Sequence, residues 1–124
     1  MGKKIQLRPG YKFRKVNTRL YDGNDKLKWI WAEATDEFIL RAASGTNYLI
    51  HIIHAGNCNN AEASVISEDD AAKYETCPPE ELRDLYKASV TVVSLDPDEY
   101  EESRPTLLDV IRAIYKREDE AAVR

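Results

Sequence analysis

The sequence is poor in cysteine and has no long apolar run, and each shortage argues against a class of protein. Only two cysteines occur among 124 residues, so a secreted scaffold held by disulfides is not expected. No apolar run approaches the roughly 18 residues of a membrane-spanning helix, and the N-terminal region lacks the apolar stretch of a signal peptide. Neither a Walker loop nor a Gly-x-Gly-x-x-Gly fingerprint occurs, so no cradle for nucleotide phosphates is predicted. These absences predict a soluble, cytoplasmic protein without a membrane-bound part.

The composition that remains is that of a folded domain. Apolar residues make up 43% of the chain and charged residues 32%, which suffices for a hydrophobic core. The length is typical of one domain, and we find no internal repeat of solenoid length. We therefore expect a single domain over residues 1–124.

Charge is sorted along the chain. Residues 1–28 hold nine basic and two acidic side chains, a net charge of +7, and the remaining residues carry a net charge of −11. The whole chain has a net charge of −4. Two explanations stay open: the basic N-terminal segment forms a surface for an anionic partner, or it neutralises acidic elements within the fold.

The hydrophobic pattern predicts an α+β fold. Short alternating segments indicate a mainly antiparallel meander of about four to six strands from residues 3–66, with a further strand near 89–95. The first of these strands would cover residues 3–8 and end at the Pro9-Gly10 turn. Residues 36–44 alternate as a strand does, although Thr35 and Gly45 could also cap a short helix. We favour the strand.

Two or three helices are expected to cover this sheet. Ser67 with Asp70, and Thr106 with Asp109, match the spacing of a helix N-cap. The longest helix is predicted over about residues 106–119, with apolar positions at helical spacing. Because Glu118 falls among those apolar positions, we expect packing to end near Tyr115 and the acidic tail 118–124 to fray.

One group of residues has the composition of a zinc site, namely His51, His54, Cys58 and Cys77. If residues 48–54 form a strand, however, the two histidines point to opposite faces. The loop over residues 56–60 also carries no known nucleophile signature. Nothing indicates a carboxylate with the raised pKa of a general acid. We therefore predict no metal, no cofactor and no enzymatic activity.

Basic residues alternate with aromatic ones near the N-terminus, as in surfaces that bind single-stranded nucleic acid. Trp29 and Trp31 share a face with Leu27, so they form either a stacking platform or part of the core. The candidate nucleic-acid-binding residues are Lys12, Arg14, Lys15, Arg19, Lys26 and Lys28.

A stretch of acidic residues near the C-terminus offers a different surface. Five carboxylates surround Tyr100 within seven residues, and such a segment could dock into a basic groove of another protein. The candidate partner-binding residues are Trp29, Trp31, Asp96, Asp98, Glu99, Tyr100, Glu101 and Glu102. We therefore predict a non-catalytic protein-interaction or regulatory module of the adaptor or inhibitor type. A nucleic-acid-binding β-surface is the alternative, and homodimerisation stays open.

Overall fold

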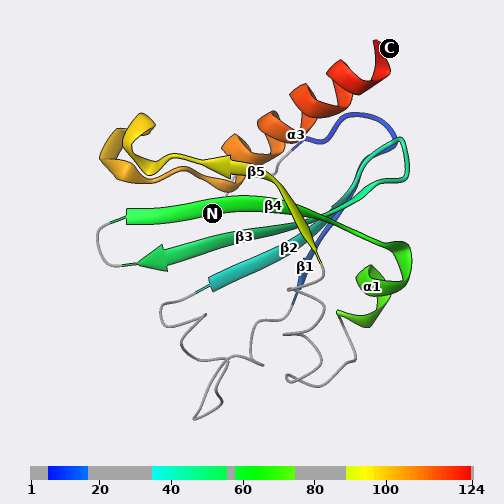
Figure 1. Cartoon of the computed structure of the whole chain (residues 1–124), viewed down its shortest axis with the longest axis horizontal. Helices are drawn as coiled ribbons and strands as arrows, with labels where there is room; N and C mark the ends of the chain where they lie inside the picture. The colour runs from blue at the N-terminus through cyan, green and yellow to red at the C-terminus, as the bar shows by residue number, and fades with distance from the viewer. Residues whose placement is uncertain (1–5, 17–34, 56–57, 75–88, 124) are drawn as a thin grey trace.

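The computed structural model describes residues 6–16, 35–55, 58–74 and 89–123 (Figure 1). Its strands are β1 (Lys12–Val16), β2 (Thr35–Arg41), β3 (Asn47–Ala55), β4 (Cys58–Ile66) and β5 (Val90–Leu95). Its helices are α1 (Glu68–Lys73) and α3 (Leu107–Ala122), with two single-turn 3₁₀ helices, η3 (Pro97–Glu99) and η4 (Glu101–Ser103), between β5 and α3.

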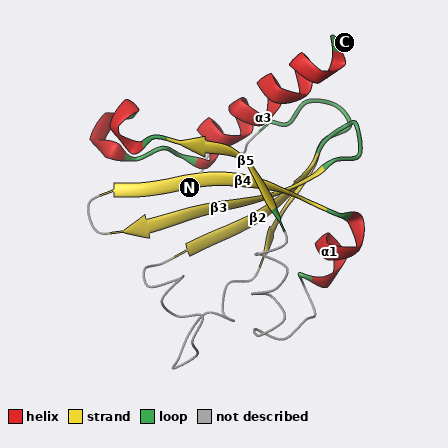
Figure 2. Ribbon diagram, in the orientation of Figure 1, coloured by secondary structure: helices red, strands yellow, loops and turns green. Residues whose placement is uncertain are grey.

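The strands form a single antiparallel meander. Their order in the sheet is β1-β2-β3-β4-β5, so each strand pairs with the next described strand along the chain (Figure 2). The long helix α3 lies across one side of this sheet, and the short helix α1 follows β4 at one end (Figure 1). The predicted α+β class, with a mainly antiparallel sheet and its longest helix at the C-terminus, is confirmed.

The segment that the sequence left open, residues 36–44, contains strand β2. A tight turn joins β2 to β3, in which the Ala42 amide donates to the Thr46 carbonyl (2.8 Å) and the Gly45 amide donates to the Ala42 carbonyl (2.9 Å). Gly45 adopts a left-handed backbone with φ +96°, a conformation that costs glycine little. Gly45 therefore serves the hairpin turn and does not cap a helix.

Strand β3 is buried on both sides because its alternate residues face different layers. Tyr48, Ile50 and Ile52 belong to the main core with Ile111 and Ile114 of α3; we call this side of the sheet the helix face. The residues between them in the sequence point to the other side of the sheet. There the side-chain amide of Asn47 donates a hydrogen bond to the carboxylate of Glu68 in α1 (2.9 Å). We call this second side the far face. The two faces place the charged residues of each strand in two separate environments.

Helix α3 begins as predicted and ends later than predicted. A complete capping box joins Thr106 and Asp109, and the helix continues to Ala122. Glu118 points toward the sheet, as its place among the apolar positions requires, and there its carboxylate accepts hydrogen bonds from Ser44 (2.6 Å) and Tyr48. The expectation that the chain frays from residue 118 is therefore corrected, because polar partners hold this turn.

Two local expectations are also corrected. Residues 58–60, expected in a loop, begin β4 and pair with residues 53–55 of β3. Residues 6–8, expected at the end of a strand, have no regular structure. There the Tyr11 amide donates to the Arg8 carbonyl (3.1 Å) and closes the predicted turn at Pro9-Gly10.

In the part of the chain that the structure describes, no helix combines the length and the apolar character needed to cross a bilayer.

Candidate functional site

The acidic segment, residues 96–102, folds into two consecutive 3₁₀ turns. The Asp96 side chain caps the first turn by accepting a hydrogen bond from the Asp98 amide (3.0 Å). Each turn is closed by backbone hydrogen bonds, among them Tyr100 N–H to the Pro97 carbonyl (3.0 Å) and Ser103 N–H to the Tyr100 carbonyl (2.9 Å). The segment also contacts β4, so its backbone is held against the sheet.

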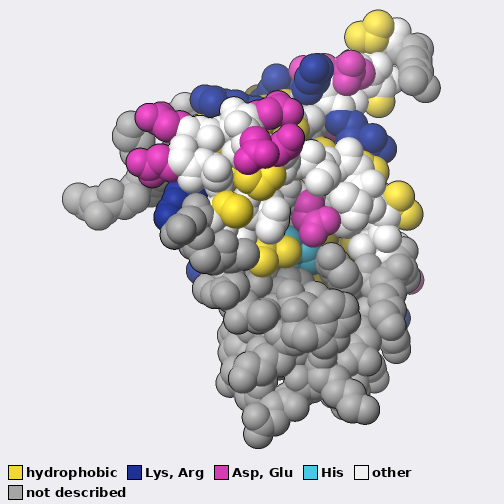
Figure 3. All heavy atoms as spheres, turned by 60° about the vertical axis from the view of Figure 1, so that its left-hand side comes forward, with side chains coloured by type: hydrophobic (Ala, Val, Ile, Leu, Met, Phe, Trp, Pro, Cys, Tyr) yellow, Lys and Arg dark blue, Asp and Glu magenta, His cyan; other side chains and the backbone are white. Residues whose placement is uncertain are grey.

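The carboxylates of this segment project into solvent. Asp96, Asp98, Glu99, Glu101 and Glu102 are all exposed. In the described part of the chain, no Lys, Arg or His lies within ion-pair distance of any of them. Figure 3 shows acidic side chains gathered on this side of the molecule, next to apolar ones. Among the described residues, the segment therefore forms an acidic surface whose carboxylates make no ion pair, with Arg104 and Arg112 across the adjacent cleft.

Two adjacent residues in the second turn adopt left-handed backbone conformations. Glu102 has φ 58° and Ser103 has φ 54°, which costs a side-chain-bearing residue about 1–2 kcal/mol. The hydrogen bond from Arg104 N–H to the Glu101 carbonyl (3.3 Å) closes the same turn. The fold thus maintains an unfavourable backbone here, and it keeps Glu101 and Glu102 exposed.

A shallow cleft of about 520 Å³ separates the acidic segment from the start of α3. Its lining combines charged, aromatic and aliphatic side chains, namely Tyr100, Glu101, Glu102, Arg104, Thr106, Leu108, Asp109 and Arg112. Leu108 is 39% exposed. Burial, and next the nearby Asp109 and Glu99 carboxylates, raise the pKa of Tyr100, so its hydroxyl remains a hydrogen-bond donor. The cleft therefore offers an apolar contact and a neutral donor beside the carboxylates.

The candidate nucleic-acid-binding residues that the structure describes do not share one surface. Lys12 and Arg14 pair with Arg41 and Ile39 of β2 on the far face, where Arg14 Nη2 donates to the Ala71 carbonyl of α1 (2.8 Å). Lys15 points to the helix face and lies 3.6 Å from Asp36. Strand β1 thus divides these cations between two faces. The other candidates, Arg19, Lys26, Lys28, Trp29 and Trp31, lie outside the described residues.

Basic residues from the start of the chain lie beside acidic residues from later elements. Arg8 Nη1 is 2.7 Å from Asp119 Oδ1 of α3, and its guanidinium carbon lies 4.2 Å from the centre of the Tyr115 ring. Lys15 approaches Asp36 in the same way. For these residues, the structure supports the explanation in which the charges complement one another within the fold.

The two histidines lie on opposite faces of β3, as predicted, and each contacts a carboxylate of β2. His51 Nε2 is 2.8 Å from Glu37 Oε2, and both side chains are 0% exposed. His54 Nε2 is 3.0 Å from Asp36 Oδ2, and both side chains are about 40% exposed. Among the described residues, no group of three or more metal-ligating side chains converges. Cys58 is a free thiol, and Cys77 lies outside the described residues.

The sequence reasoning missed both carboxylate partners, although a signal for one of them was present. The short β2–β3 turn fixes the register, and that register places Glu37 directly opposite His51. Counting residues outward from the turn at Gly45, along β2 and along β3, pairs Glu37 with His51. The Asp36–His54 contact is diagonal, so it also needs the side-chain conformations.

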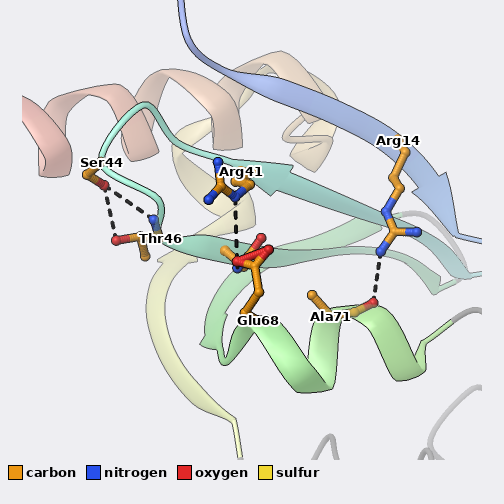
Figure 4. Close-up of polar contacts among 7 residues, drawn as sticks. Arg14, Arg41, Ser44, Thr46, Glu68 and Ala71 are labelled. Carbon is orange, nitrogen blue, oxygen red and sulfur yellow. Dashed lines mark hydrogen bonds and ion pairs between the residues drawn. The ribbon is translucent and has the colours of Figure 1, made fainter.

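The sequence reasoning also missed a cleft of about 470 Å³ between α1 and strands β1 and β2. Figure 4 shows Arg14 and Arg41 reaching from these strands toward α1, with Glu68 facing Arg41. Arg41 Nε lies 3.5 Å from Glu68 Oε2. We call this feature the basic cleft; it is lined by Lys12, Phe13, Arg14, Ile39, Arg41, Asn47, Glu68, Asp69, Ala71 and Ala72.

Comparison of the chain with protein-family models, with curated proteins and with solved structures finds no match.

Proposed function

We propose that the chain is a small non-catalytic interaction module, of the adaptor or inhibitor type, that docks on a basic surface of a partner protein through its acidic segment. The observation that supports this proposal is the set of five exposed carboxylates that the described residues leave without a counter-ion. A basic partner would supply the missing counter-charges, which steers association and selects partners.

Preorganisation supports the same function. Two consecutive 3₁₀ turns, the first of them capped by Asp96, already hold the acidic segment, so binding would order little additional backbone, and ordering is a main cost of association. Tyr100 and the exposed Leu108 border the carboxylates, and aromatic and aliphatic anchors near the centre of an interface carry much of its affinity. The proposed contact is therefore a charged rim around a small apolar centre.

We place this function in the cytoplasm. The free Cys58 thiol is consistent with a reducing compartment.

The test is affinity capture from the source cell with matched charge variants. The double variant Glu99→Gln/Glu101→Gln removes two charges from the acidic segment, and Asp119→Asn/Glu120→Gln removes two exposed charges of α3, outside both clefts. We expect a partner that binds the wild type and the control, and whose affinity for the acidic-segment variant falls about tenfold or more. The proposal is wrong if both variants retain the same partners with equal affinity.

Mixed-sequence single- and double-stranded oligonucleotides provide the test of the alternative function. If the chain binds them with an affinity that falls steeply with salt, and Lys12→Gln weakens that binding while Glu99→Gln/Glu101→Gln does not, then the nucleic-acid-binding function replaces the one proposed here.

A further inference from the structure

The basic cleft brings cations from two adjacent strands onto one face. Lys12 and Arg41 are directly opposite each other in the β1–β2 register, and Arg14 follows two residues along β1. All three line the cleft. Like charges directly opposite each other on a sheet repel and destabilise the pairing, so this arrangement opposes folding unless an anion compensates it.

The protein compensates this charge only in part. Glu68 lies 3.5 Å from Arg41 Nε and accepts a hydrogen bond from Asn47 (2.9 Å). The hydrogen bond from Asn47, and next the charge of Arg41, lower the pKa of Glu68, so its carboxylate stays charged at neutral pH. In the described part of the chain, no carboxylate lies within ion-pair distance of Lys12. The lining of the cleft thus holds three cations against the carboxylates of Glu68 and Asp69, and among the described residues Lys12 has no ion-pair partner.

The cleft also has an apolar side. Buried Ile39 of β2 lies directly opposite Arg14 and two residues before Arg41, and Ala71 and Ala72 of α1 also line the cleft. Arg14 is tied to the α1 backbone through the Ala71 carbonyl, which fixes the separation of the strand and the helix. A volume of about 470 Å³ lies within the usual range for small-molecule sites.

We propose that the basic cleft binds a small organic oxyanion, with a carboxylate or phosphate group between Lys12 and Arg41 and a short apolar body against Ile39 and the α1 alanines. Arginine and lysine form strong charge-assisted hydrogen bonds with both groups. In the free protein, Glu68 occupies part of this position as an internal competitor, and the ligand displaces it from Arg41. The proposal is independent of the function assigned to the acidic segment.

The test is a titration of ¹⁵N-labelled protein with three probes, followed by amide chemical shifts. Phenyl phosphate and benzoate carry the same apolar phenyl group with a phosphate or a carboxylate, and inorganic phosphate carries no apolar group. We expect shifts confined to residues around the cleft, with both organic probes binding more tightly than inorganic phosphate. The better of the two organic probes identifies the preferred oxyanion.

Four variants separate a built site from general attraction to positive charge. We expect Lys12→Gln and Arg41→Gln each to weaken binding about tenfold. Glu68→Gln keeps an acceptor for Asn47 and removes the competing charge, so it should tighten binding severalfold. Lys15→Gln, a change on the same strand and the opposite face, should leave binding unchanged.

Three results would overturn the proposal. The first is that no organic probe shifts the cleft residues. The second is that Lys15→Gln weakens binding as much as Lys12→Gln, and the third is that Glu68→Gln fails to tighten it. Thermal unfolding of each variant, followed by circular dichroism, ensures that folded proteins are compared.

Discussion

At the scale of single residues, the histidines show how position on a strand decides what a side chain does. His51 and His54 are three residues apart and both contact a carboxylate of β2. The His51–Glu37 pair lies entirely inside the protein, where removal of one partner takes away a close polar contact in a medium of low dielectric constant. The His54–Asp36 pair is partly solvated, so water replaces much of any lost contact.

We expect His51→Leu and Glu37→Leu each to lower the free energy of unfolding by about 3–5 kcal/mol. The double variant should lose clearly less unfolding free energy than the two single variants lose together, because neither polar group then stays buried without the other. Chemical denaturation of the four proteins gives this coupling energy. His54→Leu is the control and should cost less than about 1 kcal/mol. Additive losses at His51 and Glu37 would show that the pair is not coupled.

At the scale of secondary-structure elements, α3 is attached to the sheet in two different ways. Up to Ile114, it packs through buried aliphatic side chains. Beyond that residue polar contacts take over, with Glu118 bound by Ser44 and Tyr48, and Asp119 bound by Arg8. The first part of this attachment follows from hydrophobic periodicity. The second part depends on ionisable groups and therefore on pH.

Tyr48 makes this attachment sensitive to alkaline pH. Burial, and next the hydrogen bond to Glu118, raise the pKa of Tyr48 from 10.0 to about 12, because a phenolate would face the Glu118 carboxylate. The folded state thus holds the Tyr48 proton more tightly than the unfolded chain does. The stabilisation is complete below pH 10 and is lost as the pH rises toward 12.

We expect the free energy of unfolding to fall between pH 10 and about 12, and to fall less in Tyr48→Phe, which has no proton to lose at this position. At neutral pH, Tyr48→Phe should cost roughly 1–3 kcal/mol for the lost hydrogen bond to a charged acceptor. Denaturation curves across this pH range measure both effects. Equal slopes for the two proteins would show that Tyr48 does not carry the alkaline transition.

At the scale of the whole molecule, the elements followed from the sequence more readily than the surfaces did. Strands β2, β3 and β5 and the start of α3 depend on local alternation and capping, and local patterns are visible in a sequence. The composition of the acidic segment predicts only a loop or a single helical turn, and its two turns with left-handed Glu102 and Ser103 leave no comparable pattern in the sequence. The basic cleft depends on where α1 lies against β1 and β2, which is a long-range contact.

The candidate site residues show the same difference between local patterns and long-range contacts. The stretch around Tyr100 was identified as acidic and exposed because charge density is a local property. Lys12, Arg14 and Lys15 were grouped as one basic surface, although alternation along β1 assigns Lys15 to the other face. Nothing in the local sequence marks Arg41 as part of this group, because only the strand register brings it beside Lys12. Sequence reasoning therefore found the charges, and the pairing of the strands determined which of them act together.

The acidic segment, which follows β5, and helix α1 lie at opposite ends of the sheet (Figure 1). Because α1 lines the basic cleft, this layout predicts how copies of the chain interact. At pH 7 the net charge of −4 makes the copies repel one another. Near the isoelectric point of about 5.2 that repulsion vanishes, while the acidic segment of one copy still attracts the basic cleft of another. We expect light scattering to show self-association near this pH that added salt suppresses. Glu101→Gln should weaken it more than Glu120→Gln, which changes the net charge equally. Association insensitive to salt, or reduced equally by both variants, would show that the two ends do not attract each other.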